Sequence, residues 1–340
     1  MANLKTKYMG LELKNPVIVG ASNLVHDPDY LKKIEDAGAA AIVYKSLFEE
    51  QIQLENLEIF ERKTEYEDRN AEMITLFPSS KEDYYSPLKH LLTLEKAKES
   101  ISIPLFASLN AVNDETWVEY AKDLEETGVD GLELNFYTSP EKAGKKYNDI
   151  EKQQLKTLAK VKAAVKIPVA LKLSPFYTNP LRFIADLEEE GADAFVLFNR
   201  LFQPDINIES EEYVFSDSLS QPEDSRLPMR FAGMLYGNTN ASICANSGIF
   251  DGHDVIRMIL AGAGCVQVVS TLYLNGIGVI GSILKEINDW MGQKGYENLN
   301  SFRGKLSRNS SKDKLPYTRA QFIDFRMSTQ AILNKYRVIN

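Results

Sequence analysis

Six short apolar runs in this chain each end in a residue that could take part in chemistry. These residues are Lys45, Asn110, Asn135, Lys172, Asn199 and Asn246. A lysine at the end of a buried strand places a positive charge near an apolar floor, where it can stabilise negative charge on a bound ring or activate a nucleophile. An asparagine offers both a donor and an acceptor, as a planar heterocycle with amide-like edges requires. Together, these residue types predict a site for a small ring compound.

Two stretches near the end of the chain predict a phosphate-binding site. Asn246, Ser247 and Gly248 come just before a predicted helix. Ser270 and Thr271 come before a second stretch that contains glycine. Backbone N–H groups left free by glycine, together with a helix N-terminus, favour an oxyanion. On their own, these stretches indicate only that some phosphate binds.

A parallel barrel would bring all of these residues to one rim. Short apolar strands are predicted at 16–21, 40–45, 104–110, 130–136, 168–173, 193–199, 241–246 and 265–270. Amphipathic helices are predicted at 29–37, 87–100, 114–127, 149–165, 179–190, 251–261 and 281–292. Strands that alternate with helices, and that are apolar enough to be buried on both faces, predict an α/β fold, the (β/α)8 TIM barrel. A doubly wound sheet is the alternative architecture.

The ends of the predicted helices carry capping signals. A glycine follows four of them, at Gly38, Gly128, Gly191 and Gly262, as expected at helix C-termini. Asp114, Asp149 and Asp251 are predicted to be N-cap residues. Capped helices that alternate with apolar strands indicate parallel βα units whose strands end at one face.

Two insertions and a C-terminal extension are added to the predicted barrel. Residues 47–86 and 200–230 are too long to be simple connections, and we expect them to form lids or substrate walls on the catalytic face. The barrel is predicted to span residues 1–306. The remaining residues, 307–340, are predicted to form a helical extension that packs on the barrel or on a partner subunit.

Composition narrows the class of function. The net charge of −9 is spread along the sequence, which argues against nucleic acid or an anionic membrane as a partner. The two cysteines, Cys244 and Cys265, lie in apolar runs, so we expect buried thiols and neither a metal site nor an iron–sulfur cluster. We find no signal-peptide pattern and no apolar run of about 18 residues, and we expect a cytoplasmic protein.

Five motifs resemble one known family. They are Asn15-Pro16-Val17-Ile18-Val19-Gly20-Ala21-Ser22, Tyr44-Lys45-Ser46, Glu133-Leu134-Asn135, Ala170-Leu171-Lys172-Leu173-Ser174-Pro175 and Asn246-Ser247-Gly248-Ile249. In this order and spacing they resemble the dihydroorotate dehydrogenases, FMN-dependent barrels of pyrimidine biosynthesis, over about residues 5–306. The segment 296–306 is also similar to the flavin subunit of bacterial dihydropyrimidine dehydrogenases. The resemblance implies a homodimer.

The resemblance also implies a role for each residue of the site. The residues that it assigns to FMN are Ala21, Ser22, Lys45, Ser46, Asn110, Asn135, Lys172, Asn199, Asn246, Ser247, Gly248, Ser270 and Thr271. Lys172 would face the N1/O2 side of the flavin, where a cation stabilises the reduced anionic ring. Lys45, Asn135 and Asn199 would also contact the substrate. The phosphate would be held by Ser247, Gly248, Ser270 and Thr271.

The position of the catalytic base differs from that of the family. The family has a cysteine or serine three residues after the asparagine of Glu-Leu-Asn, and this chain has Thr138 there, followed by Ser139. Either hydroxyl could supply the proton relay, and it would need a neighbouring network to remove a proton. Glu72 lies in the segment that replaces the family's substrate loop, where its charge would oppose an anionic substrate.

The sequence leaves three functions open. The first is an FMN-dependent, dihydroorotate dehydrogenase-like oxidoreductase that acts on a CH–CH bond of a small ring substrate. The second is a Schiff-base aldolase that uses Lys172 on a phosphorylated carbonyl compound. The third is a flavin-binding barrel with lost or altered catalysis that serves as a partner or regulatory subunit.

Overall fold

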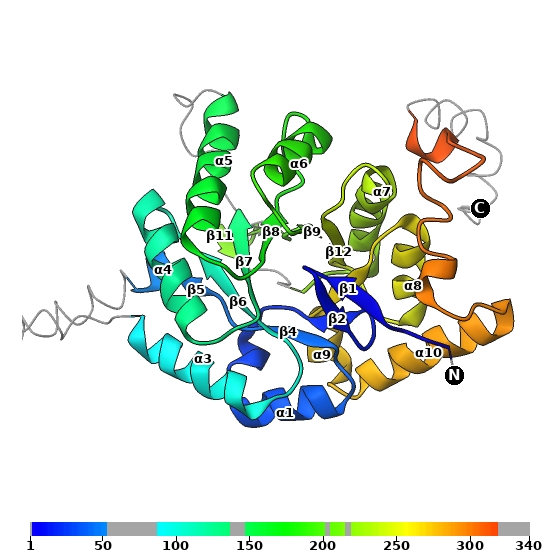
Figure 1. Cartoon of the computed structure of the whole chain (residues 1–340), viewed down its shortest axis with the longest axis horizontal. Coiled ribbons are helices and arrows are strands. Elements are labelled where there is room, and N and C mark those ends of the chain that lie inside the picture. Colours follow the sequence, from blue (N-terminus) through cyan, green and yellow to red (C-terminus); the bar gives the residue numbers. More distant parts are fainter. Residues whose placement is uncertain (1, 53–86, 137–146, 201–204, 215–218, 319–340) are drawn as a thin grey trace, which may run out of the picture.

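The computed structural model describes residues 2–52, 87–136, 147–200, 205–214 and 219–318. At its centre is a closed ring of parallel strands (Figure 1). The strands are β3 (Val17–Val19), β4 (Ala41–Val43), β6 (Leu105–Asn110), β7 (Gly131–Phe136), β8 (Val169–Leu173), β9 (Ala194–Leu197), β12 (Ser242–Asn246) and β13 (Cys265–Val268). The pairing of β4 with β6 closes the ring, and the short β5 (Leu47–Phe48) adds beside β6. The predicted (β/α)8 barrel is confirmed and the doubly wound sheet is wrong, because an open sheet would leave two edges.

Helices surround the barrel (Figure 1). They are α1 (Pro28–Asp36), α3 (Leu88–Ser100), α4 (Asp114–Glu126), α5 (Tyr147–Ala164), α6 (Pro180–Glu189), α7 (Arg226–Leu235), α8 (Gly252–Ala261), α9 (Ser270–Asn275) and α10 (Val279–Lys294). The sequence analysis did not predict α7 or α9. Helix α7 begins inside the stretch 200–230, which we expected to be an insertion, and it contains Pro228 in its first turn. A proline in the first helical turn removes no intrahelical hydrogen bond, so α7 tolerates it. No helix within the described ranges is long and apolar enough to cross a membrane.

The glycines predicted at the C-terminal ends of the helices agree with the structure, whereas the predicted N-cap residues agree only in part. Gly38, Gly128, Gly191 and Gly262 have φ angles of 110°, 78°, 97° and 140°, a region that favours glycine. Asp251 caps α8 as predicted. Asp114 is not a cap: Asn113 is the N-cap residue of α4, and Asp114 instead pairs with Lys160 at 2.9 Å. Asp149 is also not a cap, because α5 begins earlier and Asp149 lies in its first turn.

An antiparallel hairpin closes the barrel at the N-terminal ends of its strands. The hairpin consists of β1 (Thr6–Tyr8) and β2 (Leu11–Leu13). Met9 N donates to Ser242 Oγ at 3.1 Å, and Thr6 Oγ1 donates to the carbonyl of Gly264 at 2.9 Å. Apolar side chains of the hairpin and the strands form the interior core here, namely Tyr8, Met9, Leu13, Ile18, Phe106, Ala170, Ala194, Val196, Cys244 and Cys265. Both cysteines are free, buried thiols, as predicted.

The insertion at 200–230 forms structure of its own beside the barrel. It contains an exposed hairpin of β10 (Asp205–Asn207) and β11 (Glu212–Val214), then the short 3-10 helix η3 (Pro222–Ser225), and then the first half of α7. Most of the other predicted insertion, 47–86, lies outside the described residues.

The segment that follows α10 packs against α7 and α8. It contains the 3-10 helices η4 (Leu299–Ser301) and η5 (Leu315–Tyr317). The N–H groups of Gly304 and Leu306 donate to carbonyls at the C-terminal end of α8, and Arg308 N donates to a carbonyl of α7, each at 2.9 Å. These bonds satisfy carbonyl groups that a helix end leaves without partners. Residues 319–340, most of the predicted helical extension, lie outside the described residues.

Candidate functional site

Polarity increases along the barrel interior toward the C-terminal ends of the strands. Residues two apart on a strand face the same way, as do Ala170 and Lys172 on β8, and Cys244 and Asn246 on β12. The first residue of each pair belongs to the apolar interior core, and the second lines a cavity at the rim. The polar side chains therefore meet at the C-terminal face, where TIM-barrel enzymes carry their active sites.

A cavity of about 140 Å³ opens at this face. Its lining includes predicted site residues, namely Ala21, Lys172, Asn199, Asn246, Ser247, Gly248 and Ser270. It also includes residues for which the sequence predicted no role, namely Arg200, Ser220, Ile249, Gln267 and Val269. Gln267 is a polar residue within an apolar strand, which was the one signal that could have drawn attention to it.

Lys172 and Gln267 of the cavity lining form a buried polar cluster with Glu133, which does not line the cavity. The Lys172 ammonium nitrogen lies 3.8 Å from Glu133 Oε1, and the two side chains are 10% and 1% exposed. Glu133 Oε2 accepts a hydrogen bond from Gln267 Nε2. Since β7 and β13 are not neighbours in the ring, this bond crosses the barrel interior. Gln267 Oε1 has no hydrogen-bond partner in the described part of the chain.

A second polar group surrounds Asn135 on β7. Its Nδ2 donates to Ser108 Oγ at 3.1 Å and to Ser46 Oγ at 3.4 Å, and the two hydroxyl oxygens are 2.7 Å apart. Asn135 Oδ1 is buried and has no partner among the described residues. This arrangement fixes the amide and leaves its carbonyl oxygen available as an acceptor.

The predicted phosphate loops also come together. Ser247 and Gly248 both have positive φ angles, 75° and 68°. Gly248 N donates a hydrogen bond to Ser220 Oγ at 3.1 Å. The backbone N and the hydroxyl of Ser220 each donate a hydrogen bond to Ser270 Oγ at 2.9 Å. A Cβ at position 248 would lie 2.3 Å from Ser225 N, so only glycine fits there. The loop after β12 therefore packs tightly against the backbone of η3.

Some of the predicted site residues do not line this cavity. They are Ser22, Lys45, Ser46, Asn110, Asn135 and Thr271. The Thr271 hydroxyl is turned to other partners: it donates to the Phe250 carbonyl at 3.1 Å and accepts from Asn275 Nδ2 at 3.0 Å. Thr138, Ser139 and Glu72 lie outside the described residues.

His90, which lies near Lys45, is not suited to acid–base chemistry. Burial, and then the positive charge of Lys45, lower the pKa of His90 to about 4. Its ring packs edge-on against Tyr44, with centroids 5.5 Å apart. His90 is therefore neutral at physiological pH.

An adjoining cavity of about 180 Å³ extends the site along the insertion. It shares Asn199, Arg200 and Ser247 with the first cavity, and Phe198, Leu227 and Pro228 add apolar wall. Arg200 Nε lies 3.3 Å from an Asp224 carboxylate oxygen, which ties the end of β9 to η3.

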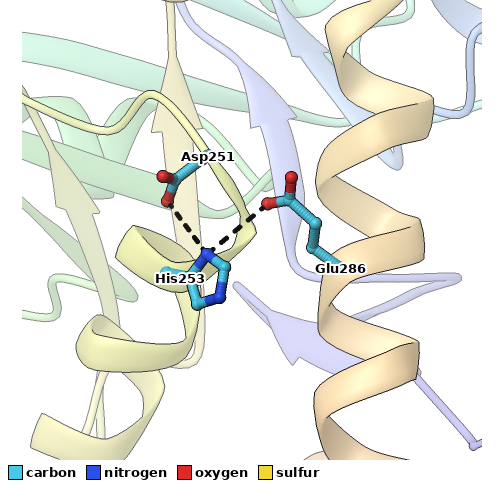
Figure 2. Close-up of side chains that lie close together, drawn as sticks. All are labelled: Asp251, His253 and Glu286. Carbon is cyan, nitrogen blue, oxygen red and sulfur yellow. Dashed lines mark ion pairs between the residues drawn. The ribbon is translucent and has the colours of Figure 1, made fainter.

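A third cluster lies on the outer surface at the N-terminus of α8. His253 Nδ1 is 4.0 Å from an Asp251 oxygen and 3.8 Å from a Glu286 oxygen (Figure 2). Two carboxylates and an imidazole this close could hold a metal ion. However, Asp251 already accepts from Asp254 N at 2.9 Å and Glu286 from Gly252 N at 2.7 Å. Both carboxylates thus satisfy N–H groups of the helix end, and we assign the cluster to joining α8 and α10.

Comparison with known proteins agrees with this geometry. The family model described as dihydroorotate dehydrogenase matches residues 3–291. Three proteins named dihydroorotate dehydrogenase B (NAD(+)), catalytic subunit, are among the relatives. That of Thermoplasma volcanium is 27% identical over 89% of this chain and 98% of its own length. Those of Methanocaldococcus jannaschii and Methanocella arvoryzae are 26% and 29% identical, over 86% and 84% of this chain and 94% and 92% of their own lengths. The chain therefore belongs to the dihydroorotate dehydrogenase family.

Proposed function

We propose that the protein is an FMN-dependent oxidoreductase that oxidises a CH–CH bond of a small ring substrate, with dihydroorotate as the first candidate. Family membership implies a flavin cofactor in general. The observation that carries the proposal is the buried ammonium group of Lys172, placed at the floor of a rim cavity and surrounded by amide groups. The aldolase and regulatory-subunit hypotheses gain no support from the relatives.

The residues of the rim fit such a cofactor. Gln267 Oε1, from a residue that lines the cavity, is a buried acceptor without a protein partner in the described part of the chain, and a flavin ring has an N–H group to donate. Asn135 Oδ1 is a second such acceptor, on β7 outside the cavity lining. At the other end, the Ser247-Gly248 turn and Ser270 form a polar cradle in the cavity lining, and the turn packs so closely against the backbone of η3 that a Cβ does not fit at position 248. Backbone N–H and hydroxyl groups in such a turn favour a phosphate, although the Gly248 N–H itself donates to Ser220 Oγ. We therefore propose that Lys172 and Gln267 hold the ring and that this cradle holds the phosphate.

When bound, FMN would supply a hydride acceptor at its N5 atom. The positive charge of Lys172 would stabilise the negative charge that the flavin ring gains on reduction. Asn135 and Asn199 would orient the substrate through amide hydrogen bonds. Thr138 or Ser139 would remove the substrate proton, which is the role that the family's pattern gives to this position.

The names of the relatives suggest where the electrons go. Those proteins are called catalytic subunits of an NAD(+)-linked enzyme. We propose that this protein likewise passes electrons to a partner subunit, and that its own barrels pair as a homodimer. Size measurement of the purified chain, alone and with a co-expressed partner, tests both statements.

Anaerobic titration of the FMN-loaded protein tests the proposed reaction. Dihydroorotate should bleach the flavin, and dihydrouracil serves as the second candidate substrate. Lys172→Met should slow bleaching by about 100-fold or more, because a preorganised charge at the reacting ring is lost. Lys285→Met removes an exposed lysine that is paired with Asp289 on α10, and it should leave the rate unchanged. If neither substrate bleaches a flavin that dithionite does reduce, the proposed substrates are wrong.

A further inference from the structure

We infer that Glu133 is a positioning residue that sets both the place and the electrostatic effect of the Lys172 ammonium group at the cavity floor. The inference rests on the proposed function, because the effect of that charge is read on a bound flavin. Glu133 makes no contact with the cavity itself, since it is absent from the lining. It acts through Lys172.

Apart from Glu133, the surroundings of Lys172 contain little that could balance its positive charge. Its register neighbours are Asn135 on β7 and Val196 on β9, and beneath it lies Ala170 of the apolar interior core. Among the described residues, Glu133 is the one acidic side chain in an ion pair with Lys172. Removing an ammonium group from water costs much free energy unless a counter-charge is near. Glu133 supplies that counter-charge.

The spacing of the pair leaves the lysine's hydrogens free for a ligand. At 3.8 Å, the Lys172 and Glu133 atoms are beyond hydrogen-bond distance, so the carboxylate balances the charge without taking an N–H group. Among the described residues, no hydrogen-bond acceptor lies within hydrogen-bond distance of the Lys172 ammonium nitrogen. The three N–H donors of the lysine are thus available to a group in the cavity.

Gln267 explains why the carboxylate keeps this distance. Its Nε2 donates to Glu133 Oε2 across the barrel, which turns Oε1 toward Lys172. Burial, then the Cys244 thiol and then the charge of Glu133 raise the pKa of the Tyr8 hydroxyl, which lies in the interior core below. The glutamate is therefore held from above by Gln267 and enclosed from below by the closed end of the barrel.

This arrangement predicts opposite effects of the two partners on the flavin. Glu133→Gln leaves the ammonium charge without its balance, so the reduced anionic ring becomes more stable and the midpoint potential rises. Lys172→Gln removes the positive charge, so the potential falls. A glutamate with only a structural role would lower stability without producing these opposite shifts.

The test is a redox titration of the FMN-loaded protein and its variants. We expect Glu133→Gln to raise the reduced-to-oxidised ratio about tenfold at a fixed potential, which is about 30 mV for a two-electron couple, and Lys172→Gln to lower it similarly. Glu133→Asp keeps the charge and should stay nearer to the parent. Glu35→Gln removes another buried carboxylate, paired with Lys32 at 2.7 Å on α1, and should leave the potential unchanged. A Glu133→Gln shift that is absent, or in the same direction as that of Lys172→Gln, overturns the inference.

A second measurement needs no flavin. Urea unfolding of the flavin-free single variants and of Glu133→Gln/Lys172→Gln forms a double-mutant cycle. We expect the double variant to lose less stability than the sum of the single losses, because each single change leaves the other group without its partner. Additive losses would contradict the coupling. The urea measurement can still be made if the protein binds no flavin. In that case the proposed function is wrong, while the coupling between Glu133 and Lys172 is still tested.

Discussion

The hydroxyl of Ser220 accepts a hydrogen bond from the backbone N–H of Gly248 at 3.1 Å, although the two residues lie 28 positions apart in the chain. Ser220 also bonds to Ser270 at the start of α9. Three segments, namely the insertion at 200–230, the loop after β12 and the start of α9, therefore meet at one point of the rim. In the proposed function this point is the phosphate end of the cofactor site.

Gly248→Ala should remove FMN binding and lower the free energy of unfolding by about 2 kcal/mol. The substituted residue would have to keep a φ of 68°, and its Cβ would lie 2.3 Å from Ser225 N. Urea unfolding and flavin titration measure the two effects. Gly10→Ala is the matched control: it has a φ of 80° and nothing within 4 Å of its Cβ, so it should lose about 1 kcal/mol and keep flavin affinity. Equal flavin affinity in both variants would contradict the assignment of the cradle.

The stability of the protein should fall as pH is lowered from 6.5 toward 4, and His90 should account for much of this fall. Its pKa is about 4 in the folded chain and near 6.5 when unfolded, so the unfolded state binds more protons between these values. The full effect is up to about 3 kcal/mol. It is measured by urea unfolding at several pH values, and His90→Gln should remove it.

Glu35 is the control for that pH dependence. Burial opposes its ionisation, but hydrogen bonds from Lys32 and Ser102 prevail and lower its pKa to about 2. Its contribution to stability is present above pH 4.5 and is lost as pH falls toward 2. Glu35→Gln should therefore alter the acid end of the curve and leave the slope between pH 4.5 and 6.5 in place. An unchanged slope in His90→Gln would show that His90 is not responsible.

Phe106→Ala should cost about 3–5 kcal/mol of unfolding free energy, because it opens a cavity in the interior core. Phe106 is 1% exposed and packs edge-on against Tyr8 of the closing hairpin, with ring centroids 5.6 Å apart. Leu88→Ala, at a residue that is 58% exposed on α3, should change stability by less than about 0.5 kcal/mol. Thermal and urea unfolding measure both. Similar losses of stability in the two variants would contradict the conclusion that the β1–β2 hairpin closes the barrel interior.

The strands and most helices could be predicted because each is encoded locally. Barrel strands are apolar on both faces, and a glycine with positive φ ends four of the helices. The failures came from residues whose role depends on distant partners. Nothing local shows that Glu133 and Gln267, in the middle of apolar strands, meet across the barrel, or that Ser220 reaches Gly248.

Cys244 and Cys265 should not react with a thiol reagent in the folded protein. Both are fully buried on neighbouring strands, and burial, the contact with Cys265 and the charge of Glu133 together raise the pKa of the Cys244 thiol. The reactive thiolate is therefore scarce as well as inaccessible. Titration with an aromatic disulfide should detect no thiol in the native protein and both thiols in denaturant. Fast reaction of either thiol in the native state would contradict the closed interior.

We propose that the rim cavity on the C-terminal face holds FMN. The visible spectrum of the purified protein, recorded before and after FMN is added and the excess is removed, tests this most directly. We predict a yellow protein that retains about one FMN per chain, and a Lys172→Met variant with an altered flavin spectrum. A colourless protein that retains no added FMN would contradict the account.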